Sequence, residues 1–166
     1  MNIFAVDHDP YHAAQDLCDK HVVKMVLESA QMLSTAQHVL RSSSSSRGAL
    51  LYKPTHINHP CNIWIRESRD NYMWLYSHYT ALSQEYTKRY GKFHSSFHKN
   101  SLWLLLGDTE FMNFPSKGLT PFAIAMKNYP DCIKPDDPVE SYRNYYRTAK
   151  KNIATWKHTP VPSWFY

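Results

Sequence analysis

Glycine, cysteine and long apolar runs are all scarce in this sequence of 166 residues. Only four glycines occur, and strand-like alternation is short wherever it appears, so the periodic signal comes from helices. Three cysteines, an odd number at wide spacing, favour reduced thiols over a disulfide framework. The absence of a glycine-rich phosphate loop and of a G-x-S-x-G element argues against P-loop NTPases and α/β-hydrolases.

Membrane and secretion signals are also missing from the sequence. No apolar run approaches the roughly 18 residues that cross a bilayer, and the first residues lack the charged and apolar regions of a signal peptide. We therefore expect a soluble cytoplasmic protein with no membrane partner, and a monomer.

The composition that remains is that of one basic globular domain. Hydrophobic residues make up 43% of the chain and aromatic residues 14%, which is enough to bury a core and argues against disorder. Nineteen lysines and arginines against 14 acidic residues give a net charge of +5. This excess of positive charge favours an anionic partner such as nucleic acid.

The helical periodicity predicts a mainly α fold built around three long helices, at about 10–40, 60–90 and 138–156. A short extended segment precedes the first helix, and residues 92–137, which several prolines divide, form a loop-rich stretch. The serine-rich residues 42–48 are predicted to be a flexible surface loop. We expect a single domain, because no linker interrupts the chain.

The ends of these helices carry specific capping signals. Asp9 suits an N-cap position, and Pro10 suits the first turn that follows it. Gly91 is placed to end the second helix. At the third helix, Asp137 with Glu140 three residues later resembles a capping box. The C-terminal aromatic residues are expected to dock on the body of the protein.

The first predicted helix is apolar over most of its circumference but has one narrow line of polar residues, here called the polar stripe. One interpretation is that the stripe faces solvent. The other is that it lines a cleft, where His21, Lys24 and Glu28 would bring an acid, a base and a cation to one wall. The stripe follows alternating steps of three and four residues and consists of His21, Lys24, Glu28, Gln31, Thr35 and His38.

A second candidate site precedes the second helix, where His56, Asn58 and His59 lead into Pro60. The free N–H groups and the positive dipole end of a helix favour an anion such as phosphate. Arg66 and Arg69 could extend such a site. The alternative is an ordinary capped helix start with surface histidines.

The third helix combines basic and aromatic residues, a mixture expected where phosphates are neutralised and bases are stacked. Basic helices can also be merely solvated, and aromatic residues at helical spacing are often part of a core. The basic residues in question are Arg143, Arg147, Lys150 and Lys151.

A metal site is a further possible interpretation, because the sequence has ten histidines. Cys18-x-x-His21, His56-x-x-His59 and Cys61 could supply ligands, but their spacings match no compact zinc module. We therefore expect no metal and no cofactor.

Several local motifs resemble one family, the pyrimidine-dimer DNA glycosylase/AP lyases of the phage endonuclease V type and their bacterial relatives. Residues 17–28, LCDKHVVKMVLE, resemble the family segment in which an Asp-x-His precedes the catalytic glutamate by seven residues. His21 and Glu28 fall on those positions. The Asn58-His59-Pro60 element and residues 85–91, EYTKRYG, are also similar to family members. The resemblance covers about residues 2–93.

This resemblance implies a mainly α, metal-independent enzyme that acts on damaged double-stranded DNA, in the host cytoplasm if a phage encodes it. In the family, the N-terminal α-amine attacks the sugar C1′ and forms a Schiff base as the base leaves, and β-elimination then cleaves the strand. An α-amino group, with an ordinary pKa of about 8, suits this attack better than an ordinary lysine. Glu28 would stabilise the cationic sugar and relay protons, and His21 would contact DNA or orient the sugar.

The sequence departs from the family pattern at the nucleophile and at two arginines. Members expose a small second residue after methionine removal, whereas Asn2 is bulky. The attacking group could therefore be the amine of Met1, or Lys20 or Lys24, or a water molecule activated by Glu28. Leu27 and Gln31 stand where the family has arginines near its glutamate. A processing enzyme for another nucleotide or modified base, or a DNA-binding accessory protein, remains the alternative function.

Overall fold

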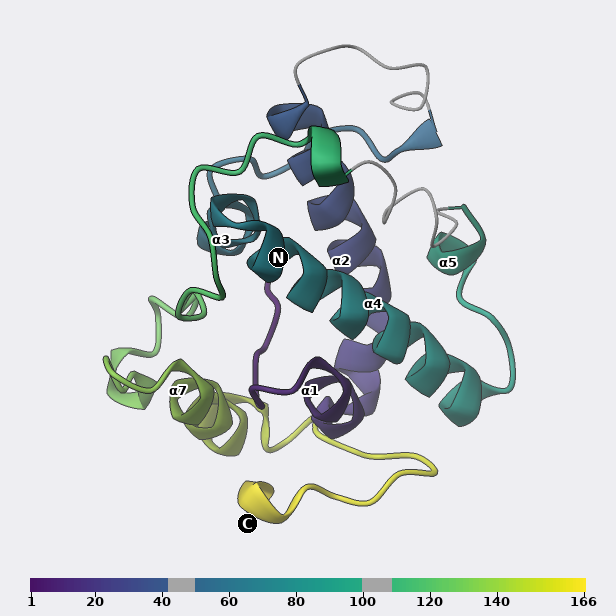
Figure 1. Ribbon diagram of the computed structural model, residues 1–166. Helices are drawn as coiled ribbons and strands as arrows, with labels where there is room; N and C mark the ends of the chain where they lie inside the picture. The colour runs from purple at the N-terminus through teal and green to yellow at the C-terminus, as the bar shows by residue number, and fades with distance from the viewer. Residues whose placement is uncertain (42–49, 100–108) are drawn as a thin grey trace.

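The computed structural model describes residues 1–41, 50–99 and 109–166, and its described part is mainly helical, as the sequence predicts (Figure 1). Its buried apolar side chains form one core cluster. The predicted flexible loop at 42–48 lies outside the described residues. None of the helices in the described ranges is long and apolar enough to cross a membrane.

The first predicted helix is divided into α1, Pro10–Asp16, and α2, Asp19–Leu40. Asp9 caps α1 as expected, since its carboxylate accepts the N–H groups of Tyr11 and His12. The prediction of one continuous helix was wrong at Leu17 and Cys18, which adopt extended conformations. Both side chains are fully buried there, so packing in the core stabilises the break. No glycine or proline marks this position in the sequence.

The second predicted helix is likewise two helices, α3, Pro60–Glu67, and α4, Arg69–Tyr90. The break is Ser68, whose extended backbone pairs with Ser116 and whose hydroxyl caps α4. Gly91 ends α4 as predicted: its φ of 67° is left-handed, and its N–H reaches the Thr87 carbonyl at 2.8 Å.

The third helix is shorter than predicted. α7, Pro138–Tyr145, continues as a single π-helical turn, Tyr146–Lys150, and does not reach residue 156. Its start is as expected, because Asp137 accepts the Glu140 N–H. After this turn the chain contacts the break between α1 and α2, where the Thr155 carbonyl accepts the Asp19 N–H.

In the residues that the structure describes, the chain between α4 and α7 is largely irregular, in agreement with the predicted loop-rich stretch. It contains α5, Ser95–Lys99, and two short 3-10 helices, Thr109–Phe111 and Pro130–Cys132. A third 3-10 helix, Ser163–Phe165, lies in the C-terminal tail. The aromatic tail docks as expected, since the Trp164 indole donates to the Asp16 carboxylate at 2.6 Å.

A fully buried arginine joins the end of α4 to the break between α1 and α2. Arg89 pairs with Glu85 at 2.9 Å and with Asp19 at 3.0 Å. It also donates to the carbonyls of Gln15 and Leu17, each at 2.8 Å. These bonds satisfy carbonyl groups that the early end of α1 leaves without helical partners.

The extended N-terminal segment runs through the middle of the molecule, between α7 and α2, to the start of α1 (Figure 1). Ile3, Phe4, Ala5 and Val6 are all buried. The first residues of the chain are therefore part of the core, and their position is fixed by what packs around them.

Candidate active site

The polar stripe of α2 faces the N-terminal segment along its middle part. His21 and Glu28 are 7% and 8% exposed, and Thr35 is fully buried, whereas Lys24 and His38 are exposed. The stripe is therefore not simply a solvent face. Its charged centre meets the beginning of the chain.

Glu28 contacts both the N-terminus of the chain and Lys24. Its Oε2 accepts the Asn2 N–H at 3.0 Å and lies 3.7 Å from the α-amine of Met1. Its Oε1 lies 3.2 Å from Nζ of Lys24, whose side chain is 65% exposed. One carboxylate thus contacts a primary α-amine on one oxygen and an accessible ammonium on the other, an arrangement suited to moving protons to and from the amine.

His21 lies about two helical turns before this carboxylate and is held by aromatic residues. Its ring stacks on Phe4 at 4.1 Å, and its Nδ1 is 2.5 Å from the hydroxyl of Tyr146. Burial, together with Lys150 and Lys24, lowers the pKa of His21 to about 4. The imidazole is therefore neutral at physiological pH, and it positions the N-terminal segment through Phe4.

His59 is the N-cap residue of α3. Its Nδ1 accepts the Cys61 N–H at 3.2 Å, so the side chain caps the helix, and Pro60 occupies the first turn. Partial burial lowers the pKa of His59, and the positive charges of the N-terminal amine and His56 lower it further. This electrostatic effect reflects how near His59 lies to the amine.

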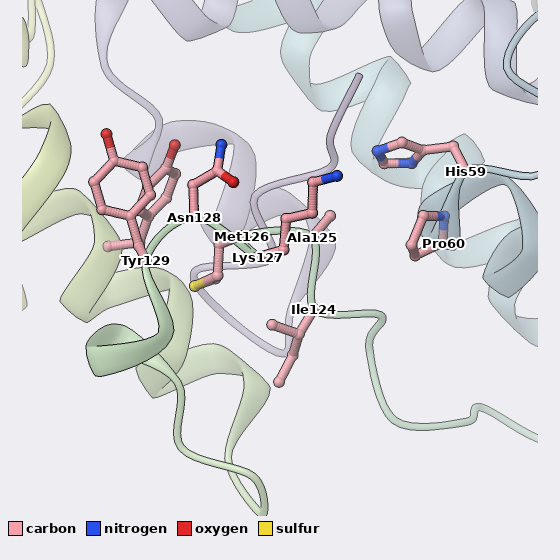
Figure 2. Close-up of a pocket in the computed structure, with 9 residues that line it drawn as sticks. His59, Pro60, Ile124, Ala125, Met126, Lys127, Asn128 and Tyr129 are labelled. Carbon is pink, nitrogen blue, oxygen red and sulfur yellow. The ribbon is translucent and has the colours of Figure 1, made fainter.

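A pocket of about 340 Å³ opens beside these groups (Figure 2). The Asn2 side chain donates to the Ala125 carbonyl at 3.0 Å, which places this wall of the pocket next to the N-terminus. Figure 2 shows the Lys127 side chain extended towards His59. The pocket is lined by His59, Pro60, Ile124, Ala125, Met126, Lys127, Asn128, Tyr129 and Tyr145.

The other residues predicted before α3 form its entrance loop. His56 and Asn58 are exposed, and His56 has a left-handed φ of 48°. Arg66 supports the loop by donating to the Ile57 carbonyl at 2.9 Å. Arg69 lies apart from this loop, at the start of α4, where it donates to Thr109.

The basic residues predicted on the third helix divide into two groups. Arg143 donates to the Val6 carbonyl and pairs with Asp7, and Arg147 binds Glu140 and the Trp164 carbonyl. Both guanidinium groups therefore hold parts of the fold together.

The lysines are more accessible. Nζ of Lys150 lies 4.9 Å from the Tyr145 ring centre, next to the pocket, and Lys151 is exposed. Lys20 is exposed on the first turn of α2. Their positions suit contact with a phosphate backbone, which stays a prediction.

The candidate metal ligands do not form a cluster. Among residues 1–41, 50–99 and 109–166, no group of three or more histidine, cysteine or acidic side chains is arranged to hold a metal ion. Cys18, Cys61 and Cys132 are buried free thiols.

Sequence reasoning missed four residues that shape this site. Asn2 binds the pocket wall at Ala125, Asn62 contacts Met1, Lys127 lines the pocket, and Tyr146 holds His21. No periodic pattern marks Lys127, which lies in an irregular segment. Asn62 could have been noticed, because it lies one helical turn after the His59 cap.

Comparison with known proteins agrees with this geometry. The sequence profile of the family described as pyrimidine dimer DNA glycosylase matches residues 1–99. The matched region contains Met1, His21, Glu28 and His59. No curated protein and no solved structure shows a significant match to the chain. Because the profile covers more than half of its 166 residues, the chain belongs to the pyrimidine dimer DNA glycosylase family.

Proposed function

We propose that this protein removes a damaged, pyrimidine-dimer-type base from double-stranded DNA and that the α-amine of Met1 is its nucleophile. The observation that carries the proposal is the 3.7 Å separation of this amine from Oε2 of Glu28. Asn2, the residue next to this amine, is hydrogen-bonded to Ala125 in the wall of the pocket. Lys24, the other candidate amine, contacts the opposite oxygen of the same carboxylate.

In the proposed reaction, the lone pair of the neutral amine forms a bond to the sugar C1′. The C1′–N bond to the base breaks, and its electron pair leaves with the base, which takes up a proton. Glu28 accepts a proton from the attacking nitrogen. The lone pair of this nitrogen then expels O4′, which takes up that proton from Glu28 as the sugar ring opens, and the iminium ion is formed. Loss of a C2′ proton then expels the 3′-phosphate and cleaves the strand.

The surroundings of the amine support a DNA substrate. A base in duplex DNA must leave the stack before an amine can reach C1′, and a pocket of about 340 Å³ lies beside the amine. Lys127, Lys150 and Lys24 border this region from three separate segments. Such cations would neutralise the phosphates that flank an extruded nucleotide.

Borohydride trapping on UV-irradiated duplex DNA tests the proposal. We expect a covalent adduct, and peptide mass mapping should place it on the α-amine of Met1. Adducts on Lys20 or Lys24 would assign the nucleophile differently. Base release without an adduct would indicate an activated water molecule. Turnover of free nucleosides but not of damaged DNA would support the alternative substrate.

A substitution of the carboxylate tests the role of Glu28. Glu28→Gln keeps the size of the side chain but loses the proton acceptor, so base release should fall by about 100-fold or more. Glu110→Gln, at an exposed glutamate, is the matched control. Base release by Glu28→Gln at the rate of the control would refute the assigned role.

A further inference from the structure

The first two residues of the chain are held by side-chain contacts that the proposed reaction does not itself require. We propose that Asn2 and Asn62 are positioning residues, which keep the α-amine of an unprocessed Met1 on Glu28. This inference rests on the proposed function, because it concerns the same nucleophile.

The Asn2 side chain fixes the direction of the N-terminal segment. Its Oδ1 accepts the N–H groups of Ile3 at 2.8 Å and Phe4 at 3.1 Å, which closes a local turn. Its Nδ2 donates to the Ala125 carbonyl at 3.0 Å, so the turn is tied to the pocket wall. The backbone N–H of the same residue is left free to bind Glu28. One asparagine thus orients both the chain and the carboxylate.

The turn also explains an unusual backbone conformation. Phe4 has a φ of 55°, in the left-handed region that residues other than glycine rarely adopt. Its restraints include the hydrogen bond to Asn2 and the stack on His21. The Phe4 ring also contacts three tyrosines of the C-terminal part, Tyr142, Tyr145 and Tyr146. Strain of this kind persists where surrounding contacts over-determine the geometry, and it is frequent at functional sites.

Met1 is seated through its side chain as well as its amine. The side chain is only 3% exposed, and Nδ2 of the fully buried Asn62 lies 3.1 Å from its sulfur. The same amide nitrogen donates to the carbonyls of Thr55 and His56, each at 3.0 Å. Asn62 therefore connects the seat of Met1 to the loop that enters α3.

The inference requires that the active protein retains Met1. Loss of Met1 would empty the seat beside Asn62. It would also turn the Asn2 nitrogen, which now donates to Glu28 as a peptide N–H, into the terminal amine. Asn2 is larger than the second residues that permit removal of an initiator methionine. Asn2 thus orients the α-amine of Met1 and, through its size, also prevents the removal of Met1.

The test compares trapping rates of three asparagine variants on UV-irradiated duplex at saturating DNA. Asn2→Leu and Asn62→Leu keep the side-chain volume and a bulky second residue but lose the hydrogen bonds. We expect each to lower the trapping rate by about tenfold or more, because small misplacements of reacting groups are costly. Asn152→Leu, at an exposed asparagine, should trap at the parent rate. Thermal unfolding checks that each variant is folded.

A positioning role predicts effects that general damage to the fold does not. The dissociation constant for lesion-containing duplex should stay within about twofold of the parent value while the trapping rate falls. Asn2→Asp keeps the acceptor for Ile3 and Phe4, so it should recover part of the rate that Asn2→Leu loses. A parent protein extended by one glycine before Met1 has its amine displaced from Glu28, and it should trap poorly although both asparagines are intact.

The outcomes separate this inference from the proposed function. If the parent protein forms no adduct, the Schiff-base function fails. If the parent traps at Met1 but both leucine variants trap at its rate, the positioning role is refuted and the function stands. An adduct on Asn2 in a protein that has lost Met1 would also refute the inference and leave the function intact.

Discussion

Lowering the pH from 7 to 5 should destabilise the protein through His78, a histidine in the core far from the proposed nucleophile along the chain. Its side chain is fully buried against Trp74, and its Nδ1 donates to the Pro10 carbonyl at 2.9 Å. Burial lowers the pKa of His78 from 6.5 to about 4. The unfolded chain therefore binds a proton below pH 6.5, whereas the folded protein does so only near pH 4.

The size of this effect follows from the difference in pKa. The difference between a pKa of 6.5 in the unfolded chain and a pKa of about 4 in the folded protein corresponds to about 3 kcal/mol of folding stability. About 2 kcal/mol of this is lost by pH 5. Stability from this group is fully present above pH 6.5 and declines as the pH falls towards 4. His21, with a pKa also lowered to about 4, adds a loss of the same sign.

Urea unfolding at pH 7 and pH 5 measures this loss. His78→Gln should be less stable than the parent at pH 7 but should lose about 2 kcal/mol less between the two pH values. His12→Gln, at an exposed histidine of α1, controls for the removal of one histidine from a helix. An equal pH-dependent loss in His78→Gln and the parent would refute the reasoning.

Three further predictions concern other parts of the molecule. Arg89→Met should lower the free energy of unfolding by about 3–5 kcal/mol, since the buried carboxylate of Glu85 and the partly buried carboxylate of Asp19 both lose the guanidinium; a loss under about 1 kcal/mol in urea would contradict this. Tyr146→Phe removes the hydrogen bond to His21 and should cost about 1–3 kcal/mol in thermal unfolding, and an unchanged melting temperature would show that the bond is not stabilising. The logarithm of the affinity for duplex DNA should fall linearly with the logarithm of salt concentration, with a smaller slope for Lys127→Ala; equal slopes would remove Lys127 from the DNA interface.

Local signals in the sequence predicted the ends of helices well. Asp9 and Gly91 act through atoms within a few residues, so their roles can be read from the chain. The breaks at Leu17 and Ser68 could not be predicted in this way. Each depends on partners far along the chain, Arg89 for the first and Ser116 for the second.

The candidate site shows the same division. Helical periodicity placed His21 and Glu28 on one face of α2, and the family resemblance singled out both. Neither signal indicated that Asn2 would bind Glu28, because the two residues are 26 positions apart and belong to different elements. The pocket wall around Lys127 has no regular secondary structure and so no period that a sequence pattern could reveal.

Most of the pocket wall comes from a different third of the chain than the amine–carboxylate pair. Met1 and Glu28 lie in the segment shared with the family, whereas residues 124–129 and Tyr145 lie beyond it. Mutations can therefore reshape one without altering the other during evolution. Under the proposed function, divergence among relatives in the C-terminal third would change which lesion each accommodates, while the N-terminal segment keeps the proposed amine and carboxylate.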